Sequence, residues 1–212
     1  MIFLTTFVHL IIEDMKQNLF LNNLMNKGAI LGLVMLCSHV LEQCAVVYGG
    51  TMTWFYIMGL EMIVAAALYV WMLYKFAKSY SLSVMEAQGE VKMFNYGRGF
   101  SYVASVSSLA GVIVGLGRYV MHSVVIGHQA YLKAMVTAVQ SALSANPESS
   151  SLMSAYEPML KQMMTQPEPG IFTTIISSVW GYMVWGMIVG LIIAAKVKHE
   201  PKLFDNKPET EE

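Results

Sequence analysis

The sequence predicts an all-α membrane protein with four transmembrane helices and an outer helical hairpin between the third and fourth of them. Of its 212 residues, 56% are hydrophobic and only 13% are charged, and the mean hydropathy is +0.52. A soluble domain is about 25% charged. This composition excludes a soluble enzyme, a disordered regulator and a strongly basic nucleic-acid-binding domain, so we expect no nucleic acid among the partners.

Four apolar stretches have the length needed to cross the bilayer, which takes about 20 helical residues. Together they contain only three charged residues, Glu42, Glu61 and Arg118. Unpaired backbone groups are costly in lipid, so long uniform apolar runs form helices. The predicted spans are residues 28–48, 52–73, 100–121 and 171–195, in a transmembrane domain of residues 27–200 that is followed by a tail of residues 201–212.

The basic residues predict the orientation of these spans. Ten of the 13 Lys and Arg residues lie on one side of a four-span arrangement, and the exceptions are Arg118, Lys133 and Lys161. Cytoplasmic loops carry an excess of Lys and Arg. We therefore expect the N- and C-termini, including the tail, to be cytoplasmic.

Residues 1–26 precede the first predicted span and allow two interpretations. The first twelve are apolar but too short to span, and they lack the positively charged start of a signal peptide. They form an interfacial extension, or the start codon lies further downstream, at Met15 or Met25. The sequence leaves both open.

The segments between the spans differ in kind. Gly97 and Gly99, beside aromatic residues, predict a tight turn where the chain re-enters the membrane. A nucleotide-binding interpretation fails because no strand precedes them and a third glycine is absent.

In residues 122–170, a helix over His128–Leu143 and an amphipathic stripe over residues 152–163 predict the hairpin. Its apolar stripe would lie on the outer leaflet, over the bundle, or against a partner.

Ionisable residues inside the spans are the candidate functional residues, because lipid-facing charge is costly and buried charge is usually paired. Their helical spacing places them on faces rich in small residues. Their depths predict a Glu42–Arg118 ion pair and a His39–Glu61 hydrogen bond. The resulting polar core either carries protons or cations through His39, Glu42 and Glu61, or only holds the helices together.

Three glycine pairs at a spacing of four residues predict close helix packing, within the chain or in a dimer. The pairs are Gly28 and Gly32, Gly111 and Gly115, and Gly186 and Gly190.

The sequence shows no pattern of a metal site, a disulfide framework or a catalytic site. The eighteen methionines and the two cysteines, Cys37 and Cys44, lack the spacing of metal ligands or of a disulfide framework, so we expect no metal and no cofactor. No nucleophile or paired-carboxylate pattern indicates an enzyme.

Several short motifs lie between Lys27 and Pro201, namely Met85–Gly89, Phe94–Phe100, Leu160–Met164 and Ile192–Lys196. Over this range the chain resembles an uncharacterised family of small four-span inner-membrane proteins typical of Bacteroidota. The resemblance implies a bacterial inner-membrane location and an accessory subunit that docks or stabilises a family-2 glycosyltransferase of the polyprenyl-phosphate sugar type. His39, Glu42 and residues 1–26 match no pattern of that family.

The leading functional expectation is a non-catalytic subunit that anchors a partner through a cytoplasmic face formed by Lys75, Lys78, Tyr96 and Arg98. The alternative is a small proton-coupled transporter that works as a homo-oligomer through His39, Glu42 and Glu61. A transporter requires one of these side chains to titrate, whereas a scaffold requires the cytoplasmic face.

Overall fold

A computed structural model describes residues 2–49, 52–88, 93–144 and 150–199. Every regular element in these ranges is a helix, and four helices are long and apolar enough to cross a membrane. The predicted all-α class with four spans and a hairpin is therefore confirmed. The elements are α1 (Ile2–Gly49), α2 (Met52–Ala87), α3 (Tyr96–Tyr119), the π-helix η1 (Val120–Ile126), α4 (His128–Ser144), α5 (Ser150–Met164) and α6 (Ile171–Val197).

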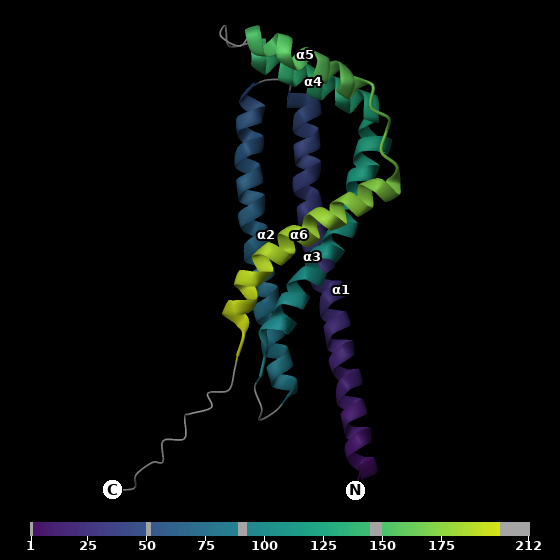
Figure 1. Ribbon diagram of the computed structural model, residues 1–212, viewed down its shortest axis with the longest axis vertical. Helices are drawn as coiled ribbons and strands as arrows, with labels where there is room; N and C mark the ends of the chain where they lie inside the picture. Colours follow the sequence, from purple (N-terminus) through teal and green to yellow (C-terminus); the bar gives the residue numbers. More distant parts are fainter. Residues whose placement is uncertain (1, 50–51, 89–92, 145–149, 200–212) are drawn as a thin grey trace, which may run out of the picture.

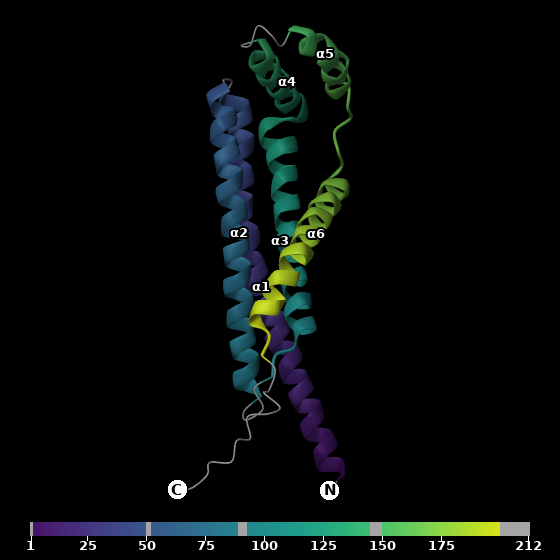
Figure 2. The same cartoon turned by 60° about the vertical axis from the view of Figure 1, so that its left-hand side comes forward.

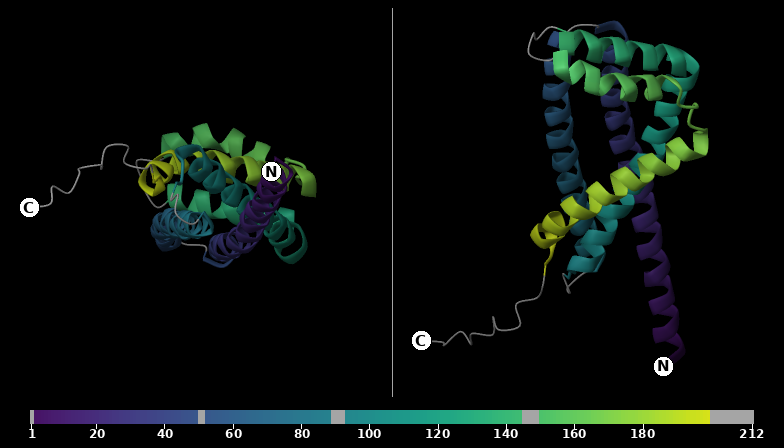
Figure 3. Two further views of the ribbon diagram at one scale, coloured as in Figure 1. Left: turned by 90° about the horizontal axis from the view of Figure 1, so that it is seen from below. Right: turned by 45° about the horizontal axis from the view of Figure 1, so that its top comes forward.

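The long helices run alternately up and down, and the hairpin of α4 and α5 lies across one end of them (Figure 1). The start of α1 and the end of α6 lie toward the opposite end (Figure 2). We call these ends the hairpin side and the terminal side. Helix α6 is strongly tilted and crosses α3, whereas α2 stands beside α1 (Figures 1 and 3).

Helices α1 and α2 are longer than a bilayer requires. At 1.5 Å per residue, the 48 residues of α1 extend about 72 Å and the 36 residues of α2 about 54 Å, against a hydrocarbon core of about 30 Å. The predicted end of the second span at Leu73 is therefore not the end of the helix. Helix α2 continues to Ala87 because no glycine or proline interrupts residues 74–88, and leaving the hydrocarbon does not by itself end a helix.

The predicted glycine turn is instead the beginning of a helix. The side chain of Asn95 caps α3, its Oδ1 accepting a hydrogen bond from the Arg98 backbone N–H at 2.8 Å, so Gly97 and Gly99 lie in the first turns. Just before the cap, Phe94 pairs with His199 through two backbone hydrogen bonds of 2.9 and 2.8 Å. This pairing joins the start of α3 to the chain just after α6.

Helix α3 lies at the centre of the bundle, with α1 and α6 packed against it. The largest buried side chains, among them Tyr102, Phe94 and Leu73, gather toward the terminal side. The hairpin-side half of α2 is different: Leu60 is 65% exposed and Ile63 is 68% exposed. Large apolar side chains on this half of α2 are therefore not covered by the other described helices.

Residues 2–26 belong to the same continuous helix as the first span, so no break marks the predicted boundary of the extension. The predicted tail, residues 201–212, lies outside the described residues.

Candidate functional site: an intramembrane polar network

His39 and Glu42 lie one turn apart on α1 and contact each other. His39 Nδ1 is 3.1 Å from Glu42 Oε2. A carboxylate only accepts, so Nδ1–H of the imidazole donates to it. The other ring nitrogen, Nε2, is 3.1 Å from the hydroxyl of Tyr182 on α6, and in neutral His39 it accepts from that hydroxyl.

A second tyrosine extends the network to the remaining two long helices. The rings of Tyr69 on α2 and Tyr182 meet edge to face, with centroids 5.7 Å apart. The Tyr69 hydroxyl lies 2.9 Å from Ser107 Oγ on α3 and 3.2 Å from the Tyr182 backbone carbonyl, and it can donate to either. Polar contacts thus connect α1, α6, α2 and α3 inside the membrane.

Glu61 on α2 accepts a hydrogen bond from the Ser38 hydroxyl on α1. The predicted His39–Glu61 hydrogen bond is therefore wrong. Consecutive residues of a helix point about 100° apart, so the face of α1 that meets Glu61 presents Ser38 and turns His39 toward α6. Depth along a span predicted the level of Glu61 but not the rotation of α1.

The predicted Glu42–Arg118 ion pair is also wrong. Glu42 is paired with His39, and Arg118 makes no hydrogen bond or ion pair with any residue that the structure describes. A partner one turn along the same helix is already in place when the helix forms, whereas Arg118 would have to meet Glu42 across two separately tilted helices.

Arg118 instead lines a cavity of about 120 Å³ beneath the hairpin. Gln43 also lines it. Its side chain is only 6% exposed, and neither its Oε1 nor Ser123 Oγ has a hydrogen-bond partner among the described residues. The complete lining is Gln43, Arg118, Tyr119, His122, Ser123, Tyr131, Pro169 and Thr174.

Two histidines link η1 to the hairpin beside this cavity. His128 Nε2 is 3.1 Å from the carbonyl of Gln166, which can only accept, so this nitrogen carries the proton. The Nδ1 of a neutral His128 then accepts from His122 Nε2–H at 2.7 Å. The chain turns between the two rings at Gly127, whose φ of 86° favours glycine.

Two titratable groups of the hairpin, Tyr131 and Glu157, have shifted pKa values with identifiable causes. Burial, and secondarily the negative charge of Glu42, raises the pKa of Tyr131, so this phenol remains a neutral hydrogen-bonding group beside the cavity. The Lys161 ammonium, 2.8 Å from the exposed carboxylate of Glu157, lowers the pKa of that carboxyl group.

The predicted packing glycines lie at contacts within the chain. A Cβ on Gly111 or Gly115 would come within 2.8 Å of the α6 backbone, and one on Gly186 would lie 2.3 Å from Ser107 Oγ. Gly28 and Gly32 face α3 in the same way, and Gly190 lies at the looser end of the α3–α6 contact. The close approach needed by the network thus depends on glycine at several positions.

The residues predicted as one cytoplasmic partner face are dispersed. Lys75 and Lys78 are exposed on α2, and the Lys75 ammonium lies 5.8 Å from the centre of the Trp71 ring. The Tyr96 hydroxyl donates to the Leu191 carbonyl on α6 at 3.3 Å. Arg98 lines a separate cavity of about 250 Å³ between α1, α2 and α3.

Sequence reasoning missed Ser38, Tyr69, Ser107 and Tyr182. A signal was available for the tyrosines, because tyrosine is typical of membrane interfaces and both of these lie well inside their helices. The serines gave no such signal, because a serine in a membrane helix can serve close packing alone and need not hydrogen-bond to another helix. Within the described residues, no three His, Cys, Asp or Glu side chains gather as metal ligands would, and Cys37 and Cys44 are free thiols.

The arrangement is able to connect four helices by hydrogen bonds and to hold His39 in one orientation. His39 contacts Glu42 and Tyr182, whereas Glu61 contacts Ser38 separately. Neither the cavity of about 120 Å³ nor the cavity of about 250 Å³ is lined by His39, Glu42 or Glu61.

Comparison with known proteins gives one match. No curated protein and no solved structure resembles the chain closely enough to be matched. A family profile described as a protein of unknown function (DUF4199) matches residues 26–199, which begin at the last residue of the predicted extension. Because this match covers most of the sequence, and the four apolar helices agree with a small membrane protein, the chain belongs to that family of proteins of unknown function.

Proposed function

We propose that this protein is a non-catalytic scaffold of a bacterial inner membrane that anchors a partner at its terminal side. The observation that carries the proposal is the excess length of α1 and α2, which extends both helices beyond the thickness of the hydrocarbon. Helical extensions of this kind offer a rigid surface outside the bilayer. The network inside the membrane supports this role because it fixes the positions of the helices.

The charge distribution supports a cytoplasmic position for the terminal side. Ten of the 13 basic residues lie there by the four-span arrangement, as the positive-inside rule requires of cytoplasmic segments. Among the exposed basic side chains are Lys75 and Lys78 on the extension of α2. We place the partner's docking surface on this part of α2.

The partner that we propose is a membrane-associated family-2 glycosyltransferase acting on polyprenyl-phosphate sugars. Its support is the family resemblance of the sequence motifs. A second copy of the chain is the other candidate, and the experiment below separates the two.

A proton-coupled transporter is the second candidate function. The contact from Glu42 through His39 to Tyr182 favours it, because His and Glu side chains in a hydrogen-bonded chain can pass protons. The position of the cavities favours the scaffold, since they lie toward opposite ends of the bundle and neither includes His39, Glu42 or Glu61.

Co-purification of the full-length protein after gentle solubilisation tests the scaffold. We expect a stoichiometric glycosyltransferase in mass spectra of the complex. A double charge reversal, Lys75→Glu with Lys78→Glu, should release it, whereas Lys133→Glu with Lys161→Glu on the hairpin side should not. Recovery of the chain alone, or equal retention by both variants, would contradict the proposal.

Proton flux into liposomes tests the transporter. The scaffold predicts that the wild-type protein and Glu61→Gln both give the flux of empty liposomes under an imposed pH gradient. A wild-type flux that Glu61→Gln abolishes, with the fold retained, would establish the transporter instead.

A further inference from the structure

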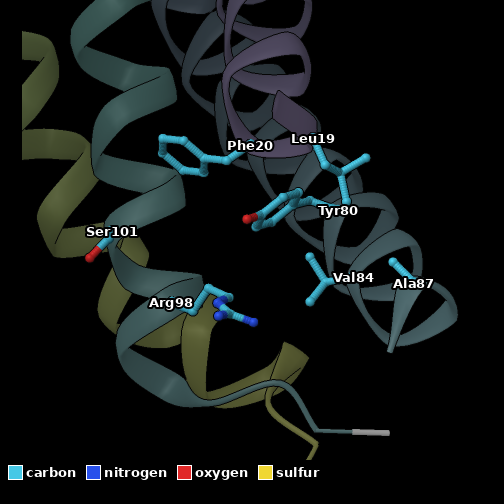
Figure 4. Close-up of a pocket in the computed structure, with 7 residues that line it drawn as sticks. All are labelled: Leu19, Phe20, Tyr80, Val84, Ala87, Arg98 and Ser101. Atoms are coloured by element: carbon cyan, nitrogen blue, oxygen red, sulfur yellow. The ribbon is translucent and has the colours of Figure 1, made fainter. Parts of the chain in front are cut away.

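The cavity of about 250 Å³ at the terminal side has an apolar wall and a polar wall. Figure 4 shows its lining side chains, contributed by α1, α2 and α3. Leu19, Phe20, Val84 and Ala87 form the apolar part, and Tyr80, Arg98 and Ser101 supply the polar groups.

The Tyr80 hydroxyl and the Arg98 guanidinium have no hydrogen-bond partner among the described residues. The exposed Ser101 lies at the edge of the cavity, and its hydroxyl points away from both of them (Figure 4). Tyr80 is only 4% exposed, yet its hydroxyl points into the space between α2 and α3 (Figure 4). The Tyr80 hydroxyl is open to the cavity in largely apolar surroundings, so a ligand with an acceptor atom would give it a partner. A phenol and a guanidinium can both donate hydrogen bonds, and the guanidinium carries a positive charge.

The Tyr80 ring and the Arg98 backbone are held in place before any ligand arrives. The Tyr80 ring stacks on Tyr102 with centroids 4.2 Å apart, and Tyr102 in turn donates a hydrogen bond of 2.6 Å to Asn23 on α1. The Asn95 cap holds the backbone from which the Arg98 side chain extends in the first turn of α3. The N-terminal end of a helix adds partial positive charge to the same place.

We propose that this cavity binds the phosphate group of an anionic membrane lipid. Arg98 and Tyr80 donate to the phosphate oxygens, and the beginning of one acyl chain lies along Leu19 and Phe20. Arginine suits phosphate because its planar guanidinium can donate two parallel hydrogen bonds. The apolar wall distinguishes a lipid from free phosphate, which would gain nothing from it.

The size and place of the cavity agree with this occupant. It is smaller than the roughly 300–1,000 Å³ of pockets that enclose drug-sized ligands, so only the headgroup end is enclosed and the chains remain in the bilayer. Exposed Lys75, Lys78 and Lys196 lie in the terminal-side parts of α2 and α6, where they attract anionic lipid.

Native mass spectrometry of the full-length protein tests the site. The protein is released from phosphatidylcholine nanodiscs that contain a minor fraction of phosphatidylglycerol, and the retained lipids are counted. We expect one retained phosphatidylglycerol. Arg98→Gln should weaken its retention about tenfold, the equivalent of one charge-assisted contact. Arg98→Lys should restore part of it.

Two further variants separate the cavity from general charge and from folding. Lys196→Gln removes an exposed positive charge near the same end of the molecule and should retain the lipid as the wild type does. Ala87→Trp fills the cavity from an exposed position and should lose the lipid while Arg98 is intact. Thermal unfolding in lipid-free detergent should be unchanged for all of these variants.

Three results would overturn the proposal. They are retention of phosphatidylglycerol no greater than its share of the nanodisc, equal losses in Arg98→Gln and Lys196→Gln, and binding of inorganic phosphate alone with the affinity of the lipid. The last result would identify the cavity as a site for a soluble anion. Each outcome is independent of whether a protein partner docks on α2.

Discussion

Tyr69 and Tyr182 each bring a hydroxyl group into apolar surroundings within the membrane. Each hydroxyl is close to a polar group on another helix, Ser107 for Tyr69 and His39 for Tyr182. Hydrogen bonds between transmembrane helices contribute about 0.6–2 kcal/mol each. They also select one rotation of each helix, because a turned helix would leave the hydroxyl without a partner.

We predict that Tyr69→Phe lowers the free energy of unfolding by about 1 kcal/mol, because Ser107 Oγ becomes a buried group without its donor. Denaturant titration of the detergent-solubilised protein measures the change. Ser107→Ala is the matched partner variant. If the hydrogen bond is real, the double variant is less destabilised than the sum of the two single ones, and strict additivity would contradict it.

At the scale of the element, α3 and α6 approach each other through glycine rather than through large side chains. Gly111 and Gly115 bring α3 against the α6 backbone, and Gly186 brings α6 against Ser107. This contact holds Tyr182 and Ser107 within reach of Tyr69. The three glycine pairs could be identified in the sequence by their spacing, but which helix each pair faces follows only from the crossing of α3 and α6.

We predict that Gly186→Ala destabilises the protein by about 1–3 kcal/mol, the usual effect of overpacking. The added Cβ would lie 2.3 Å from Ser107 Oγ and 2.4 Å from its Cβ, so the helices must separate. Gly181→Ala is the control on the same helix, because no atom lies within 4 Å of its added Cβ. Thermal unfolding in one detergent compares them, and equal midpoints would contradict the close contact.

At the scale of the whole molecule, α1 joins the terminal-side core to the polar network. Phe20 meets the rings of Tyr80 and Tyr102 edge to face, and Asn23 accepts the hydrogen bond from Tyr102. Both residues precede the part of the chain that the family profile matches, which begins at residue 26. The N-terminal segment is thus part of the packed bundle in this protein from about Leu19 onward.

Two truncated chains test that role. A chain that starts at Met15 keeps Phe20 and Asn23 and should unfold at the temperature of the full-length protein. A chain that starts at Met25 loses both and should be destabilised by about 2–4 kcal/mol, since a partly buried aromatic side chain and a hydrogen bond are removed. Equal stability of the two chains would show that the contacts of Phe20 and Asn23 contribute little.

The sequence by itself determined the fold class, the number of spans and the hairpin. The physical reason is that a bilayer requires long apolar helices. The length of each such helix and its lack of charge can be recognised from that stretch of the sequence alone. The same argument placed His39, Glu42 and Glu61 inside the membrane. It could not give the full lengths of α1 and α2, because helices end at capping or breaking residues and not at the edge of the hydrocarbon.

Only the tertiary structure decided which polar groups meet. Whether Glu61 bonds to Ser38 or to His39 depends on the rotation of α1 against α2, and a change of one residue turns the contact by about 100°. The positions of Arg118 and Arg98 depend on tilts that the sequence does not specify. The two cavities likewise exist only where three or more helices diverge, which is a property of their packing and not of any one segment.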